Sequence, residues 1–352
     1  MPHAIPDGLS IAAARLLGYS GFRGPFALVP LAGGRNNQVY RVDLADQSLV
    51  LKAYFQHPGD RRDRLGAEYA FSTFAWSHGV RTLPQPLACD PEHRLALFSF
   101  IPGRKLTPFE VTTERVTEAA DFFRQVNREA HDPWARRLPI GSEACFRLAD
   151  HLDCLARRSR RLLSMEPVSA VDREAVEFVT YELEPMCREL LDVTSSRARS
   201  YGLSLDAELS WSDRCLSPSD FGFHNALLTP SGTLNFLDFE YAGWDDPVKT
   251  VCDFFCQPEL PASLDDLTEL AVAVVGPLTD SIAHRRRINL LLPVYRLKWC
   301  CIMLNDFLPA DNQRRQFARG EGDENERKLR QLAKARKAAA VVGESLECRT
   351  AA

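Results

Sequence analysis

The sequence of 352 residues lacks several features that would place it in a specialised class. No apolar stretch is long enough to span a bilayer, because the best one, Ile288 to Leu304, is interrupted by Arg296 and Lys298. The first residues have no basic start followed by an apolar run, so we expect no secretory signal and a cytoplasmic location. The 43 basic and 47 acidic residues give a net charge of −4, so bulk charge predicts neither binding to nucleic acid nor insertion into a membrane.

The ten cysteines lack the spacing of a metal site. None of them forms a Cys-x-x-Cys pair, and no group of histidines stands at the spacing that zinc requires. In a chain without an export signal, scattered cysteines of this kind are usually reduced and buried. We therefore expect free, unreactive thiols and no structural metal site.

The N-terminal residues have the pattern of a β-sheet. Residues 39–44 alternate between apolar and polar, and residues 49–54 resume the apolar run after a turn, which predicts a hairpin. A helix is predicted over residues 64–76, and Gly79 follows it as a left-handed cap. A second pair of strands is predicted to end with residues 95–101.

The rest of the chain has mainly the periodicity of helices, interrupted by a short hairpin between residues 225 and 239. The break at Pro102-Gly103 predicts a boundary between a β-rich N-terminal lobe over residues 1–101 and a helical C-terminal lobe over residues 102–342. Residues 343–352 are expected to form a flexible tail. These elements together predict an α+β fold with two lobes.

The most informative segment holds Asp220 and, five residues later, Asn225, directly before the predicted hairpin. Asp238 follows Asp220 by eighteen residues, at the end of a predicted strand. Transfer of a phosphoryl group from ATP needs one carboxylate that accepts or orients the proton of the attacking hydroxyl. It also needs a neutral oxygen ligand and a second carboxylate that hold Mg²⁺ against the phosphates. Two short loops supply all three groups.

The N-terminal residues supply the matching groups. Gly33 and Gly34 stand at the entry to the first hairpin, where glycines allow backbone N–H groups to approach phosphate oxygens. Lys52 lies in an otherwise apolar strand, and Glu68 follows sixteen residues later on the predicted helix. A strand lysine held by a helix glutamate, so that it reaches the phosphates, is the arrangement found in kinases. Each residue alone is common, but their order along the chain indicates a kinase.

These motifs resemble those of the aminoglycoside phosphotransferase and choline kinase family, which shares the bilobal protein-kinase-like fold. The resemblance spans roughly residues 25 to 310 and rests on the following motifs: Gly33-Gly34-x-x-Asn37, Lys52, Glu68, Phe98 to Gly103, Asp220-x₄-Asn225, Asp238-x-Glu240, Asp245-Asp246-Pro247 and Asp253.

The resemblance implies a role for each matching residue. Asp220 would be the catalytic base, and Asn225 and Asp238 would bind Mg²⁺. Lys52 and Glu68 would orient the phosphates of ATP. The other nucleotide contacts that the resemblance implies are Gly33, Gly34 and Asn37 in the phosphate loop and the backbone of Ser99, Phe100 and Ile101 at the adenine.

The chain departs from the family pattern at two places. The family usually has His-Gly-Asp at the start of the catalytic loop, whereas this chain has Pro218-Ser219-Asp220. The missing histidine is mainly a packing residue, so we expect altered support of the loop and not lost chemistry. Two acidic residues, Asp245 and Asp246, precede a proline where the family commonly has one, and we expect Asp246 or Asp253 to cap the next helix.

The acceptor pocket is expected, from the resemblance, to lie against the late helices. Arg296 and Trp299 are candidates to touch the acceptor, and a core helix with one solvated face explains the same pattern equally well. A sugar, an amino alcohol or a cell-envelope precursor would fit, and the arginine-rich residues 157–161 would suit a substrate that already bears phosphate. A cationic aminoglycoside would instead favour an acidic pocket, for which three residues are candidates: Glu240, Asp245 and Asp246.

The sequence therefore predicts an ATP- and Mg²⁺-dependent phosphotransferase that acts on a hydroxyl of a small molecule, with a metabolite or carbohydrate favoured as acceptor. A nucleotide-binding pseudokinase or regulatory module stays open, because Pro218-Ser219 departs from the family pattern. A protein kinase is disfavoured, because the metal position reads Asp238-Phe239-Glu240 and no Ala-Pro-Glu follows. The short segment between Asp238 and Pro247 also leaves almost no room for a platform that docks a peptide.

Overall fold

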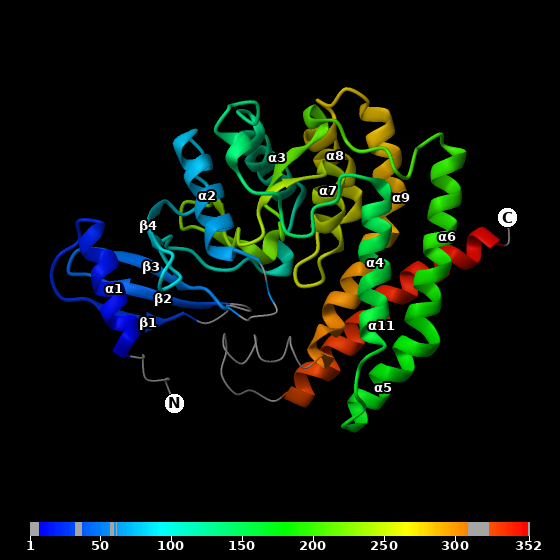
Figure 1. The fold of residues 1–352 in the computed structure, drawn as a ribbon, viewed down its shortest axis with the longest axis horizontal. Helices are drawn as coiled ribbons and strands as arrows, with labels where there is room; N and C mark the ends of the chain where they lie inside the picture. The colour runs from blue at the N-terminus through cyan, green and yellow to red at the C-terminus, as the bar shows by residue number, and fades with distance from the viewer. Residues whose placement is uncertain (1–6, 32–36, 57–59, 61, 309–323, 351–352) are drawn as a thin grey trace.

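The computed structural model describes residues 7–31, 37–56, 60, 62–308 and 324–350. Within these residues, an N-terminal part built on a β-sheet lies beside a larger helical part, as Figure 1 shows. This arrangement confirms the predicted α+β fold with a β-rich and a helical lobe. The boundary between residues 101 and 102 stays a prediction; the last strand of the sheet ends shortly before it, at Ser99.

The N-terminal part is one antiparallel sheet with a helix on each face. Its strand order is β1-β2-β3-β5-β4. Alternation along β5 explains the two faces: Leu95 and Leu97 pack in the core that includes α1, whereas Ala96 and Phe98 contact the start of α2. The elements are α1 (Asp7–Tyr19), β1 (Ala27–Pro30), β2 (Gln38–Asp43), β3 (Ser48–Ala53), α2 (Arg64–Ser77), β4 (Pro86–Asp90) and β5 (Leu95–Ser99).

The predicted hairpin is confirmed by the pairing of β2 with β3, in which Val39 lies opposite Lys52. Helix α2 matches the predicted helix, with Gly79 just beyond its end in the left-handed region at φ +88°. Phe71 and Phe74 of α2 are buried in the core of the helical part, whereas Leu65 packs against the sheet. Helix α2 therefore joins the two parts. A side chain of α2 that lies between Leu65 and Phe71 is held at the junction of the sheet and the helical part.

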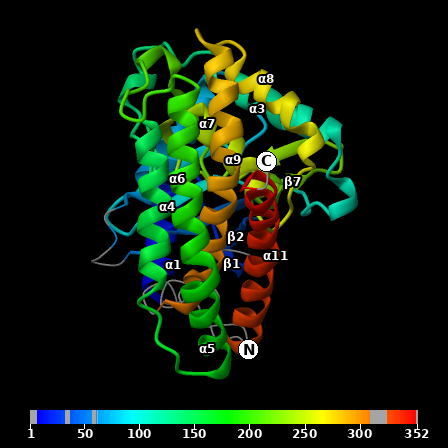
Figure 2. The ribbon, with the colours of Figure 1, turned by 90° about the vertical axis from the view of Figure 1, so that its right-hand side faces the viewer.

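The helical part is a bundle around α9, which packs against α4, α6, α7 and α11. Figure 2 shows these long helices running beside one another. None of the helices that the structure describes is both long and apolar enough to cross a membrane. The helices are α3 (Thr113–Asn127), α4 (Leu148–Leu162), α5 (Ala170–Phe178), the π-helical turn η3 (Val179–Leu183), α6 (Glu184–Ser200), α7 (Pro247–Cys256), α8 (Leu267–Val275), α9 (Ser281–Met303) and α11 (Glu324–Thr350).

Two short antiparallel strand pairs bring the predicted catalytic and metal segments together. The predicted hairpin is β7 (Ala226–Leu228) with β8 (Leu234–Phe236), and the sequence does not predict the second pair, β6 (Cys215–Ser217) with β9 (Gly243–Asp245). The chain runs from β6 to β7 through one loop and from β8 to β9 through another. Because β6 pairs with β9 and β7 pairs with β8, these two loops lie side by side.

The C-terminal residues correct one prediction. We predicted a flexible tail over residues 343–352, but helix α11 continues through Thr350, and Leu346 is buried in the helical core. Val342 is buried in the same core, so the last turns of α11 have an apolar face to pack. This packing holds residues that the general looseness of chain ends would leave free.

Gly243 is expected to be required for stability, because β9 passes very close to residues 139–141. A Cβ at this position would lie 2.3 Å from the Pro139 carbonyl oxygen and 2.6 Å from the Gly141 nitrogen. We predict that Gly243→Ala lowers the free energy of unfolding by about 1–3 kcal/mol, since backbone atoms cannot move aside without strain. Gly18→Ala in α1 is the control, because a Cβ there meets nothing within 4 Å. Equal stability of the Gly243→Ala variant and the parent in denaturant unfolding would contradict the close approach.

Candidate active site

Lys52 lies at the centre of the candidate site and connects both lobes. Its ammonium nitrogen is 2.6 Å from Glu68 Oε2 on α2 and 2.5 Å from Asp238 Oδ1 in the loop after β8. The side chains of Lys52 and Glu68 are almost completely buried, whereas that of Asp238 is about a third exposed, at 34%. The structure thus places the predicted lysine, its helix glutamate and the predicted metal carboxylate in one chain of contacts.

The charges around Lys52 keep it protonated. Burial alone would lower the pKa of Lys52, but the carboxylates of Asp238, Glu68 and Glu240 outweigh that effect and raise the pKa above its ordinary value. Burial raises the pKa of Glu68 despite the neighbouring ammonium. A fixed cation of this kind, directed at the junction of the lobes, can bind an anionic group such as a phosphate.

Tyr54 is part of this cluster and was not among the predicted site residues. Its hydroxyl donates a hydrogen bond to Glu68 Oε2 at 2.8 Å, on the oxygen that also contacts Lys52. Burial raises the pKa of Tyr54 well above its usual value, so the hydroxyl stays a donor. The available signal was the spacing: Tyr54 follows Lys52 by two residues, which places both side chains on one side of an extended strand.

The predicted metal segment, residues 237–240 after β8, holds Asp238 in an unusual backbone conformation. Its φ of +68° lies in the left-handed region, which aspartate tolerates better than most residues. The preceding residue, Leu237, donates its N–H to the Asn225 carbonyl at 2.8 Å, which fixes this segment to the neighbouring loop. The turn therefore directs the Asp238 carboxylate toward Lys52 immediately after the last contact between the strands.

The predicted catalytic turn, residues 218–225 between β6 and β7, brings Asp220 and Asn225 together, as predicted. Asn225 Nδ2 donates to the Asp220 backbone carbonyl at 3.0 Å and to its Oδ2 at 3.2 Å. His224 Nε2 lies 3.2 Å from the other carboxylate oxygen, Oδ1. These contacts hold the Asp220 carboxylate in a defined orientation.

Aromatic side chains anchor both loops in the core of the helical part. Phe221, which follows Asp220, packs with its ring centroid 5.7 Å from that of Phe122 and 5.0 Å from that of Phe236. Phe239, which follows Asp238, packs 4.9 Å from Phe71 on α2. In each loop the aromatic residue beside the acid is buried, so the carboxylate is presented from a rigid base.

The catalytic turn is supported by hydroxyl groups in place of the histidine that the family usually has. Ser217 Oγ accepts a hydrogen bond from the Ser219 N–H at 3.0 Å and lies 2.9 Å from Thr250 Oγ1 on α7. Ser219 itself has a left-handed φ of +56°. The sequence prediction of altered loop support therefore has a specific form: a buried hydroxyl pair stabilises the strained residue before Asp220.

Glu240 does not have the accessibility that we predicted for an acceptor contact. Its side chain is 1% exposed, and its Oε2 accepts a hydrogen bond from Asn37 Nδ2 at 2.6 Å. Arg64 Nε lies 3.6 Å from the same oxygen. Asn37, predicted in the phosphate loop, is thus fixed to the metal segment, and Glu240 is a contact inside the protein.

Asp245 and Asp246 are also internal, which corrects the prediction that Asp245 touches the acceptor. Both are fully buried. Asp245 pairs with Lys249 and accepts the Cys145 N–H at 3.0 Å. Asp246 is the predicted helix cap: it begins α7 by accepting the Val248 N–H at 2.8 Å.

The two predicted acceptor contacts on α9 differ in their surroundings. The Trp299 ring N–H donates to Asp253 Oδ1 at 2.9 Å, and the Trp299 residue is 8% exposed. Arg296 is half-buried. Lys298 binds both oxygens of Asp253, at 2.8 and 2.9 Å, so Asp253 is neutralised within the fold. Arg296 therefore has more surface for an acceptor than Trp299 has.

The predicted nucleotide contacts at the two ends of the sheet are described only in part. Gly33 and Gly34 lie outside the described residues. The Ser99 N–H already donates to the Gln85 carbonyl at 2.9 Å, and its hydroxyl accepts the Gln85 N–H at 2.8 Å. The Ser99 N–H is therefore engaged within the protein, and the contacts of Phe100 and Ile101, which follow β5, with adenine stay a prediction.

The donor groups fit a magnesium ion. Asn225 uses its amide N–H₂ toward Asp220, which leaves its amide oxygen as the group available to a cation. Asp238 uses Oδ1 toward Lys52, which leaves Oδ2. One amide oxygen and one carboxylate are enough protein ligands for Mg²⁺, because phosphates and water supply the other ligands. No larger group of acidic, histidine or cysteine side chains that could hold a metal occurs among the described residues.

The two-lobed fold, with a buried strand lysine facing an acidic loop, defines a protein of the kinase-like class. A comparison with protein-family models matches residues 27–266 to the phosphotransferase enzyme family. This match covers more than half of the sequence, and the chain belongs to that family. A comparison with curated proteins found no match.

Solved structures with a similar fold include kinases of small molecules. The chain resembles spectinomycin phosphotransferase APH(9)-Ia, solved with ADP and spectinomycin, with a TM-score of 0.62 and 12% identity over 97% of this chain and 99% of that chain. It resembles the choline kinase LicA from Streptococcus pneumoniae, with a TM-score of 0.59 and 13% identity over 96% and 100% of the two chains. The choline kinase from Cryptosporidium parvum gives 0.54 and 13% over 97% and 98%. At these identities the likeness shows the fold.

The buried carboxylate of Asp246 makes the free energy of unfolding depend on pH in the acid range. Burial alone would raise the pKa of Asp246, but Arg287 and His151 outweigh it and hold the pKa well below its usual range. The folded protein therefore keeps this carboxylate ionised at pH values where the unfolded chain, near its ordinary pKa of about 4, takes up a proton. Stability from this group is present above about pH 4 and decreases as the pH falls below it.

We predict that Asp246→Asn costs about 3–5 kcal/mol at pH 7, because it leaves Arg287 buried without its partner. The difference in unfolding free energy between parent and variant should shrink as the pH falls from about 4 toward 2. Denaturant unfolding across this range measures it, and Asp121→Asn, on the exposed face of α3, is the control. A difference that stays constant with pH would show that the pKa of Asp246 is not depressed.

Proposed function

We propose that the protein transfers the γ-phosphoryl group of ATP to a hydroxyl of a small molecule, with Mg²⁺ bound by Asn225 and Asp238. The observation that supports this most strongly is the contact of Lys52 with both Glu68 and Asp238 at the junction of the lobes. Phosphoryl transfer depends mainly on positioning and on neutralising charge. The buried Lys52 cation would neutralise charge on the phosphates, and the nearby acidic loop would help to position them.

An adenine nucleotide is the favoured donor. The spectinomycin phosphotransferase of similar fold was solved with ADP, and LicA was solved in complex with AMP. In this chain, Lys52 would contact the phosphates, and the backbone of Phe100 and Ile101 would contact the adenine. When bound, Mg²⁺ would neutralise negative charge on the phosphates.

Asp220 is the proposed base. One of its carboxylate oxygens contacts His224 and the other accepts from Asn225, so the carboxylate cannot turn freely. A carboxylate held in this way can orient the acceptor hydroxyl and accept its proton as the oxygen attacks phosphorus. The same turn holds Asn225, so it carries both the proposed base and one of the two proposed Mg²⁺ ligands.

The acceptor is proposed to be a metabolite or a carbohydrate hydroxyl. A polycationic aminoglycoside would require accessible acidic groups, but Glu240, Asp245 and Asp246 are each buried and paired with a cation of the protein. Arg296 is half-buried, and Arg157, Arg160 and Arg161 are exposed. These cations would suit an acceptor that already bears an anionic group. A screen of hydroxylated compounds with ATP, in which phosphorylated products are detected by mass, tests this proposal.

A pseudokinase is the second candidate, supported by the absence of the usual residues before Asp220. The serine and threonine hydroxyls that support this loop reduce the weight of that departure. Binding of Mg·ADP combined with no product from any acceptor, and with no ATP hydrolysis, would favour the pseudokinase.

Replacing the proposed base should separate chemistry from binding. We predict that Asp220→Asn lowers the rate of phosphate transfer by about 10²–10⁴-fold, because the acceptor proton loses its base. Affinity for Mg·ADP, measured by calorimetry, should change little. Turnover close to that of the parent would refute the role of Asp220.

Replacing the proposed metal carboxylate should affect metal and nucleotide together. We predict that Asp238→Asn raises the Mg²⁺ concentration needed for half-maximal nucleotide binding by about tenfold or more, because the amide has no negative charge. Asp172→Asn is a matched control, because Asp172 also pairs with a lysine, Lys328 at 2.9 Å, but joins α5 to α11. Superimposable Mg²⁺ titrations of the Asp238→Asn variant and the parent would contradict the assignment.

A further inference from the structure

Glu240 closes a ring of contacts between the lobes. Its Oε2 accepts from Asn37 Nδ2 at 2.6 Å, and Asn37 Oδ1 accepts the Phe55 N–H at 3.1 Å. Arg64 donates through one terminal nitrogen to the Phe55 carbonyl at 3.1 Å, and its Nε lies 3.6 Å from Glu240 Oε2. The ring therefore joins the start of β2, the end of β3 and the start of α2 to the metal segment.

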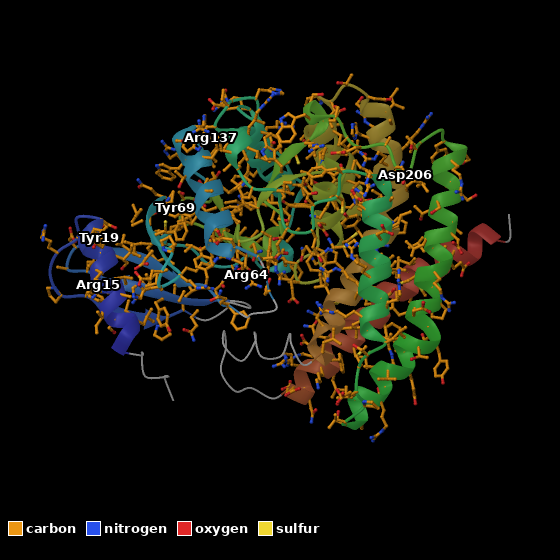
Figure 3. The ribbon with its side chains drawn as sticks, viewed as in Figure 1. Arg15, Tyr19, Arg64, Tyr69, Arg137 and Asp206 are labelled. Carbon is orange, nitrogen blue, oxygen red and sulfur yellow. The ribbon has the colours of Figure 1, made fainter. Side chains whose placement is uncertain are left out.

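The ring is buried and combines a cation, a carboxylate and a neutral amide. Asn37, Arg64 and Glu240 are each no more than 3% exposed. Figure 3 places Arg64 between the sheet and the helical part. Arg64 faces two carboxylates: one terminal nitrogen donates to Asp60 Oδ2 at 2.5 Å, and the buried Nε, which makes no hydrogen bond to the described residues, lies nearest to Glu240 Oε2. Loss of the Glu240 charge would remove the carboxylate that comes from the helical lobe, so that Arg64 would keep only Asp60, which lies four residues before it in the chain.

The spacing along the chain connects the ring to the catalytic cluster. Phe55 follows Lys52 by three residues, and Arg64 precedes Glu68 by four, which is about one helical turn. Glu240 follows Asp238 by two residues. Each member of the Lys52–Glu68–Asp238 cluster thus lies within four residues of a member of the ring along the chain.

We propose that Glu240 is a positioning residue: through Asn37 and Arg64 it sets the distance between the N-terminal lobe and the metal segment, and so keeps Lys52 in reach of Glu68 and Asp238 when nucleotide binds. The inference rests on the proposed function and deepens it. It assigns Glu240 neither to the acceptor nor to the metal, because its carboxylate is engaged within the protein.

Glu240→Gln tests the inference, because glutamine has nearly the same shape and no charge. Mg·ADP binding is measured by calorimetry at saturating Mg²⁺, with thermal unfolding as a check of the fold. We expect the dissociation constant for Mg·ADP to rise about ten- to hundredfold, since Asn37 and Arg64 both lose the charged partner that joins them to the segment after β8. The control is Asp306→Asn, because Asp306 is also a buried carboxylate that contacts an arginine, Arg327 at 3.1 Å, but lies after α9 in the helical part.

A second pair of variants tests the same contact from the other lobe and guards against misfolding of Glu240→Gln. Asn37→Asp places a carboxylate against Glu240 and should weaken Mg·ADP binding by repulsion. The double variant Asn37→Asp, Glu240→Gln restores a donor and an acceptor in reversed order, with one negative charge near Arg64. We expect it to bind Mg·ADP more tightly than Asn37→Asp alone, which a purely local loss of stability would not produce.

Three results would overturn the inference. Equal Mg·ADP affinity of Glu240→Gln and the parent would show that the ring does not position the site. A loss of affinity in Glu240→Gln that appears only below saturating Mg²⁺ would show that Glu240 is a metal ligand instead. A double variant no better than Asn37→Asp would show that the Asn37–Glu240 contact has no role in binding. A parent protein that binds no Mg·ADP would instead overturn the proposed function.

Discussion

The buried ammonium of Lys52 is the constraint on which the arrangement of the site depends. A cation without compensation in such a place would be strongly unfavourable, so it requires carboxylates close by. One comes from α2 and one from the loop after β8, and this places the sheet, the helix and the acidic loop at fixed distances. Because α2 also packs its Phe71 and Phe74 into the helical core, the charge contact and the apolar contact act on the same helix.

In the two loops that carry Asp220 and Asp238, each acidic residue is followed by an apolar one. In the catalytic turn and in the metal segment, an acid is followed directly by a buried phenylalanine, Phe221 or Phe239, and these rings pack in one aromatic cluster with Phe122. The apolar partner takes the position toward the core, which leaves the acid on the other side. Asp238 and Ser219 adopt left-handed backbone conformations, which cost free energy. The packing of the neighbouring aromatic rings in the core offsets this cost. The packing of the core and the direction of the chemical groups therefore have a common cause.

Much of this site was predictable from the sequence, and the parts that were not have a common physical reason. The lysine, the helix glutamate, the two loops and the hairpin that joins them have local signals of alternation, capping and spacing. The contacts of Glu240 with Asn37 and Arg64 have no such signal, because they join residues far apart in the sequence. Asp245 looked like an exposed acid for the same reason: its partner Lys249 is nearby in sequence, but its burial depends on the pairing of β6 with β9. The last turns of α11, from residue 343 onward, were missed because a terminal segment gives no sign of the surface against which it packs.

The concentration of buried polar groups at the junction of the lobes is itself an argument for chemistry. Lys52, Glu68, Arg64, Asn37 and Glu240 are nearly inaccessible to solvent and lie within one small region. Removing such charges from water costs several kcal/mol per ion, and apolar residues of similar volume would often give equal or greater stability. Elsewhere in the N-terminal lobe the chain does use that solution, with leucines and alanines between α1 and the sheet. Stability alone therefore does not explain the polar cluster, whereas the proposed phosphoryl transfer would, because it requires Lys52 and the acidic groups around it to be held in fixed positions.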